Sequence, residues 1–184
     1  MKCLVCKDVD LEESELSPGL KVHRCNSCSG SWLKFGDYLE WSNCHDIETV
    51  ESNPASIHSQ VIDSDNPKVC PDCGTILSVY KVANNLAFKL EHCATCNGIW
   101  LDKGEWTNLE ENNMNHKINK FFTETWQKNL RDDELREYFE DFYKSRFGTE
   151  GYEKIKEVKE WLDNNDKNKS MLIAFLLNND PYKL

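Results

Sequence analysis

The motif Cys93-Ala-Thr-Cys96-Asn-Gly98-Ile-Trp100-Leu101-Asp102-Lys-Gly104-Glu105 occurs twice in this chain, in two related forms. The earlier form, Cys25-Asn-Ser-Cys28-Ser-Gly30-Ser-Trp32-Leu33-Lys34-Phe-Gly36-Asp37, begins 68 positions upstream. It keeps both cysteines, the glycines, the Trp-Leu pair and an acidic last residue. Another Cys-x2-Cys pair precedes each form, Cys3 with Cys6 and Cys70 with Cys73. The chain therefore contains a tandem repeat of a four-cysteine module.

Each module has the cysteine spacing of a tetrahedral metal site. One Cys-x2-Cys pair places two thiolates on a single tight turn, and the second pair completes four ligands. The residues between the pairs number 18 in the first module and 19 in the second, within the ~15–20 residues typical of zinc sites. We therefore predict two Zn²⁺ ions per chain. The predicted ligands are Cys3, Cys6, Cys25 and Cys28 in the first site and Cys70, Cys73, Cys93 and Cys96 in the second.

These cysteines could have uses other than binding zinc. Four thiolates also hold iron, so the residues alone leave iron open as the metal. The chain runs from Met1 directly into Cys3 with no apolar leader, so we expect a cytoplasmic protein, where disulfides are rare. A thioredoxin-like dithiol requires one Cys-x2-Cys at a helix start in a βαβ setting, which this repeat does not resemble. Four thiolates leave a metal no open position, so we expect structural sites.

The segments around the cysteines carry strand and helix signals. In the second module, residues 75–82 and 86–92 predict a β-hairpin that leads into Cys93. Asp102 and Glu105 have the spacing of a capping box, which predicts a short helix starting near residue 103.

Small modules of this kind have room for only a small core. We expect Trp32 and Trp100 each to cover the hairpin of its own module. Gly74 follows the second cysteine of a tight turn, where a positive φ is often required.

From residue 112 onward the apolar residues follow a helical period. They group as Ile118, Phe121, Phe122, Trp126 and Leu130, then Leu135, Tyr138, Phe139, Phe142 and Tyr143 up to Gly148, then Tyr152, Ile155, Val158, Trp161 and Leu162, and finally Met171 to Leu177. We expect these aromatic residues to form the core of a small helical bundle.

These patterns predict an α+β protein with two small antiparallel-β zinc ribbons followed by a C-terminal helical bundle. The predicted divisions are residues 1–43 for the first ribbon, 44–68 for an acidic linker, 69–111 for the second ribbon and 112–184 for the helical domain.

Charge and hydropathy limit the classes of partner. The net charge of −10 repels polyanions, and no basic cluster that could replace the counterions of DNA or RNA is visible. Nucleic acid is therefore possible but disfavoured, and a protein partner is preferred. The longest apolar run near the C-terminus, Met171 to Leu177, has seven residues, whereas a membrane-spanning helix needs about 20.

Both modules resemble the transcription-factor-IIB-type zinc-ribbon family, whose pattern is Cys-Pro-x-Cys, a hairpin, and Cys-x-x-Cys-x-Gly-x-Trp-Leu-Asp-x-Gly-Glu. The second module matches through Cys70, Pro71, Cys73, Cys93, Cys96, Gly98, Trp100, Leu101, Asp102, Gly104 and Glu105. The first module has Leu4 in place of the proline and Lys34 in place of the aspartate. The resemblance covers roughly the first 110 residues. It implies zinc binding, an association with transcription, and contact with proteins such as polymerase rather than with DNA.

The residues outside the two quartets show no catalytic constellation. Cys44 could be a reactive thiol, but an unpaired cysteine is more often a small apolar residue. His23 and His92 adjoin ligand cysteines and could replace one of them, although the complete quartets favour supporting or surface roles. We therefore expect a non-enzymatic interaction module, with a nucleic-acid or transcription-complex factor as the alternative and a Cys44-dependent enzyme as a third.

Overall fold

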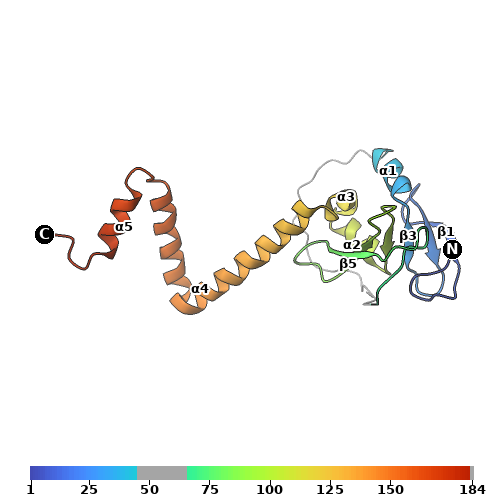
Figure 1. The fold of residues 1–184 in the computed structure, drawn as a ribbon, viewed down its shortest axis with the longest axis horizontal. Coiled ribbons are helices and arrows are strands. Elements are labelled where there is room, and N and C mark those ends of the chain that lie inside the picture. The colour runs from blue at the N-terminus through green and yellow to red at the C-terminus, as the bar shows by residue number, and fades with distance from the viewer. Residues whose placement is uncertain (45–65, 183–184) are drawn as a thin grey trace. The chain divides into compact units, whose positions relative to one another are not determined.

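The computed structural model describes residues 1–44 and 66–182. Most of the predicted acidic linker, residues 44–68, lies outside the described residues. The chain divides into two compact units, Met1–Asp132 and Asp133–Leu184, and each is described by itself (Figure 1).

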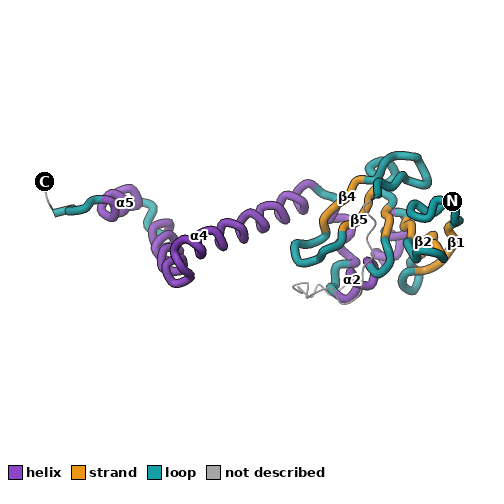
Figure 2. Tube along the Cα trace, turned by 90° about the horizontal axis from the view of Figure 1, so that it is seen from below, coloured by secondary structure: helices purple, strands orange, loops and turns teal. Residues whose placement is uncertain are grey.

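The first unit contains a single antiparallel sheet (Figure 2). Its strands are β1 (Leu11–Glu15), β2 (Lys21–Cys25), β3 (Ser31–Leu33), β4 (Ser78–Lys81), β5 (Lys89–His92) and β6 (Ile99–Leu101). Their order is β1-β2-β3-β6-β5-β4, so the first three strands come from the first cysteine module and the last three from the second. The two ribbons are therefore joined edge to edge in one sheet.

The joint between the ribbons is made by equivalent strands of the repeat. Strand β3 pairs antiparallel with β6, and Trp32 lies opposite its repeat equivalent, Trp100. The neighbouring pairs are Ser31 with Leu101 and Leu33 with Ile99. A self-complementary contact of this kind is what a local two-fold axis produces, here within one chain.

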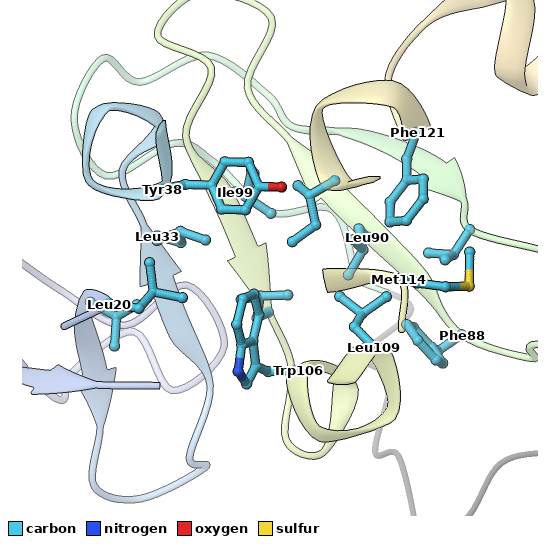
Figure 3. Packing of buried hydrophobic residues seen from close by; sticks show 14 of the residues in the cluster. Leu20, Leu33, Tyr38, Phe88, Leu90, Ile99, Trp106, Leu109, Met114 and Phe121 are labelled. Atoms are coloured by element: carbon cyan, nitrogen blue, oxygen red, sulfur yellow. The ribbon is translucent and has the colours of Figure 1, made fainter. Parts of the chain in front are cut away.

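Side chains on the joined strands alternate between the two faces of the sheet, as in any pleated strand. On one face, Leu33, Ile99 and Leu101 pack against the helices α1 (Phe35–Cys44), α2 (Glu105–Glu111) and α3 (Ile118–Phe121). The short 3₁₀-helix η1 (Asn115–Lys117) connects the last two helices. Figure 3 shows this helix-side core, which includes Tyr38 of α1 and Trp106 of α2.

The opposite face carries the cysteines. Trp32 and Trp100, both with no exposed surface, form its centre together with the buried cysteines and two leucines. The members of this metal-side core are Cys3, Leu11, Cys25, Trp32, Cys70, Leu77, Cys93 and Trp100. Burial of both indoles between the ribbons explains why modules of this size remain folded together.

The second unit is helical. Helix α4 (Glu124–Asp163) begins in the first unit, where the Trp126 Nε1–H donates to the Val82 carbonyl at 3.0 Å. Its helical dihedrals are interrupted at Gly148, with φ 71° and ψ 156°, as predicted from the end of the apolar pattern there. Helix α5 (Lys169–Leu177) follows.

The burial of the C-terminal aromatics differs from the expectation. None of the described residues of α4 and α5 is buried, and Tyr138 and Trp161 have 65% and 50% of their surface exposed. The predicted helical periodicity is present, but the aromatic side chains beyond residue 133 do not form a core. Of the described apolar residues that the helical pattern groups from residue 118 onward, Ile118 and Phe121 are buried, and both lie in the first unit.

The predicted α+β class with two antiparallel ribbons and C-terminal helices is confirmed. Among the described residues, no helix combines the length and the apolar character required to cross a membrane.

Candidate metal centres

The structure brings the eight repeat cysteines together in two groups of four. Within each group the Sγ atoms all lie within 4.8 Å of one another. In the first group Cys3 and Cys28 are 3.6 Å apart, and Cys6 and Cys25 are 3.9 Å apart. In the second group the Cys70–Cys96 and Cys73–Cys93 distances are both 3.4 Å.

These separations fit a tetrahedral ion and not a disulfide. Four sulfurs at ~2.3 Å from a zinc ion lie about 3.8 Å from one another, whereas bonded sulfurs are about 2.05 Å apart. All the cysteines of both groups are free thiols. Soft thiolates suit zinc or iron, and the four of them complete a closed shell with no position left for water or substrate.

All four cysteine turns have the same backbone conformation. The residue after each second cysteine has a left-handed φ: 61° at Lys7, 61° at Ser29, 76° at Gly74 and 59° at Asn97. Each of these residues donates its N–H to the carbonyl of the first cysteine of its turn, over 2.8–3.0 Å. The positive φ predicted at Gly74 is confirmed. The sequence gives no comparable signal at Lys7 and Ser29, because such a conformation is uncommon for residues other than glycine, asparagine, aspartate and histidine.

The protein environment prepares individual thiols for ionisation. Hydrogen bonding with the side chain and the backbone of Thr75 lowers the pKa of Cys73 to about 6. Burial raises the pKa of Cys25, but hydrogen bonds from the N–H groups of Cys28 and Ser27 lower it by more. The net result is a pKa of about 7. Burial raises the pKa of Cys28 and of Cys70. Four neighbouring thiols cannot all ionise without a cation, and a divalent metal supplies the charge that makes this possible.

Each tryptophan of the joint rests on the cysteine turns of the opposite ribbon. A Cβ placed on Gly98 would lie 2.1 Å from a ring carbon of Trp32, and one placed on Gly30 would lie 2.2 Å from a ring carbon of Trp100. Only glycine therefore fits at these two positions. Both indoles are buried, as the sequence suggested, and each also covers a cysteine turn of the neighbouring ribbon, a contact that was not expected.

The two indole N–H groups use different carboxylates. Trp100 Nε1 donates to Asp102 of its own ribbon at 2.7 Å, whereas Trp32 Nε1 donates to Asp72 of the opposite ribbon at 2.9 Å. Lys34 replaces the equivalent of Asp102 in the first ribbon, so Trp32 has no such acceptor in its own module. Asp72, which stands where the first repeat has Val5, supplies it instead.

This arrangement predicts a specific cost for loss of Asp72. Asp72→Ala leaves the Trp32 N–H without its carboxylate, and we expect the free energy of unfolding to fall by about 1 kcal/mol. Asp72→Asn keeps a side-chain oxygen and should lose less than half of that. Denaturant titrations of the zinc-loaded variants measure the difference. Equal stability of the alanine variant and the original protein would contradict the role given to this contact.

Asp102 also belongs to a buried group of charges beside the second site. The Lys68 ammonium donates to Glu91 and, at 3.1 Å, to Asp102. All three residues are at most 6% exposed. Burial lowers the pKa of Lys68, but the hydrogen bond and charge of Glu91 and the charge of Asp102 raise it more, so the net pKa is raised. Asp102 thus has a buried structural role.

The capping interaction predicted for Asp102 and Glu105 is present in part. The Asp102 N–H donates to the Glu105 carboxylate at 2.8 Å. Helix α2 begins at Glu105, two residues later than expected, after Gly104 with φ 89°. The Asp102 carboxylate does not cap the helix, because it is engaged by Lys68 and Trp100.

The remaining candidate residues lie outside the sulfur groups. Cys44 is exposed at the end of α1. His92 stacks on Phe122 with ring centroids 4.1 Å apart, which makes it part of the packing of the first unit. His23 lies in β2 and is half-buried. The structure includes none of these three residues in either group of potential ligands.

The comparisons with known proteins address the choice between zinc and iron. Residues 2–43 and 69–112 both match the transcription factor zinc-finger family, a family of zinc ribbons. No curated protein and no solved structure matches the chain. The two matched regions coincide with the two Cys₄ groups, so the metal is zinc, with two ions per chain. The two halves of the joined sheet are therefore tandem zinc ribbons similar to the transcription factor zinc-finger family.

Proposed function

We propose that this chain is a non-enzymatic protein-interaction module in which two structural zinc ions hold the ribbons rigid and the C-terminal helices contact a protein partner. The closed thiolate shells support a structural role for zinc, because catalytic zinc keeps one position open for water or substrate. The family description makes a protein of the transcription machinery the first class of partner to test.

The observation that carries this proposal is the exposure of large apolar side chains on α4 and α5. Exposed apolar surface marks interaction sites in soluble proteins when it is extensive, and aromatic residues and methionine are enriched in the centres of protein interfaces. The exposed residues are Leu135, Tyr138, Phe139, Phe142, Tyr143, Phe147, Ile155, Val158, Trp161, Met171, Ile173, Phe175, Leu176 and Leu177.

The charge of the chain supports a protein partner over nucleic acid. The net charge of −10 opposes approach to a phosphate backbone. Three lysines of α4 are also paired with acids along the helix: Lys144 with Glu140, Lys154 with Glu150 and Lys159 with Asp163. The positive charge of these three lysines is therefore already offset by neighbouring carboxylates.

The proposal is tested by recovering partners of the tagged chain from its own cell lysate, with and without nuclease. We expect a protein that survives nuclease treatment to be captured by the original chain and lost with Tyr138→Glu or Trp161→Glu. Lys154→Glu changes the charge of the same helix at an exposed position without removing an apolar side chain, and this variant should still capture the partner. Capture that disappears with nuclease would replace this proposal with nucleic-acid binding, and equal capture by all variants would exclude the helical surface.

A further inference from the structure

We infer that the two zinc sites are energetically coupled, so that each site binds its ion more tightly when the other is filled. The coupling elements are the reciprocal contacts between Trp32 and Gly98 and between Trp100 and Gly30. This inference concerns the ribbon unit alone and does not depend on the partner proposed above.

Trp32, from the first ribbon, contacts both cysteine turns of the second site. Its ring covers Gly98, two residues after Cys96, and its Nε1–H donates to Asp72, which lies between Cys70 and Cys73. The indole is fully buried, so these contacts are made without competing water. One side chain of the first ribbon therefore depends on the positions of both turns that hold the second ion.

The reverse contact couples the second ribbon to the first site. The Trp100 ring covers Gly30, two residues after Cys28. Trp100 is also fully buried, and it lies opposite Trp32 in the pairing of β3 with β6. Each ribbon therefore contributes one buried indole to the turns of the other.

The covered glycines are themselves part of the cysteine turns. The Gly30 carbonyl accepts the N–H of Cys25 at 2.8 Å, and the Gly98 carbonyl accepts the N–H of Cys93 at 2.9 Å. The glycine that contacts each indole thus also holds the backbone of a cysteine ligand in place. A ligand turn of this kind is held in place by its metal. Loss of one ion therefore displaces the glycine against which an indole of the other ribbon packs.

The first test removes one site and measures the affinity of the other in the full chain. Cys6→Ser with Cys28→Ser leaves only the second site, and Cys73→Ser with Cys96→Ser leaves only the first. Competition with a chromogenic chelator should show that the remaining site binds zinc about 5- to 150-fold more weakly than in the original protein, the usual range of coupling between sites. Complete loss of zinc would be the same coupling at its strongest, and an affinity within twofold of the original would overturn the inference.

The second test asks whether the indole contacts carry the coupling. Gly98→Ala forces a methyl group against Trp32, whereas Gly36→Ala places its methyl where no atom lies within 4 Å. We expect both zinc ions of Gly98→Ala to pass to the chelator faster than in the original protein, and Gly36→Ala to release them at the original rate. Trp32→Phe, a milder change made in the other ribbon, should also accelerate both ions. Acceleration of one ion with the second at its original rate would show independent sites.

Discussion

Removal of zinc with a strong chelator is expected to unfold the sheet of residues 1–132. Structural zinc contributes about 10 kcal/mol or more of folding free energy per site, and a domain of this size has a total stability of about 5–15 kcal/mol. The metal-side core depends on the cysteines directly, because they pack against Trp32 and Trp100. The expected signals are a red shift of tryptophan emission and collapse of the dispersed amide resonances of the strands.

Two controls make the zinc-removal result specific. Addition of two equivalents of zinc should restore the native spectrum, whereas magnesium, which prefers oxygen ligands and octahedral geometry, should not. A metal-free protein that keeps dispersed strand resonances and buried tryptophans would contradict the structural role of the ions.

Replacement of Lys68 by methionine is expected to be the most damaging single substitution outside the cysteines. Methionine is of similar length but removes the ammonium that pairs with the buried carboxylates of Glu91 and Asp102. Breaking a buried ion pair by removing one partner costs about 3–5 kcal/mol, a large part of the stability of one domain. Thermal or denaturant unfolding of the zinc-loaded variant measures this loss.

Lys2 provides a matched control for Lys68. It also forms an ion pair, with Asp10 at 2.9 Å, but its side chain is 59% exposed. Exposed pairs are hydrated and contribute little, so Lys2→Met should leave the unfolding midpoint unchanged. If the Lys2 and Lys68 substitutions had the same effect, the buried group of charges would have no special importance.

Several features could be predicted because they depend on local spacing. The cysteine intervals predicted the two Cys₄ groups, and the strand signals of residues 75–82 and 86–92 predicted β4 and β5. The break at Gly148 also follows from a local signal, because the apolar pattern ends there and glycine tolerates positive φ. Such signals need no knowledge of what the ribbon touches.

The joint between the ribbons could not be predicted from such signals. Nothing local distinguishes a tryptophan that covers its own hairpin from one that covers its neighbour, since both are buried beside glycine. The pairing of β3 with β6 joins residues about 70 positions apart and depends on a two-fold arrangement that a repeat permits but does not require. The edge strand β1 was also missed, because Leu11–Glu15 is mostly polar and exposed.

The exposed aromatics of α4 and α5 show a different limit. Helical spacing of apolar residues predicts a face that is covered, but it does not say whether the cover comes from the same chain. Tyr138, Phe142 and Trp161 keep the expected period and are nevertheless exposed. This difference between the pattern and its burial is the basis of the proposed interaction surface.

X-ray absorption at the zinc edge, on purified protein of known metal content, tests the central claim most directly. The claim is that each Cys₄ group holds one zinc ion with all four sulfurs. The predicted result is two zinc ions per chain and a first shell of four sulfurs at about 2.3 Å, without nitrogen or oxygen. A single ion per chain, or a shell in which an oxygen or nitrogen replaces a sulfur, would contradict two closed structural sites.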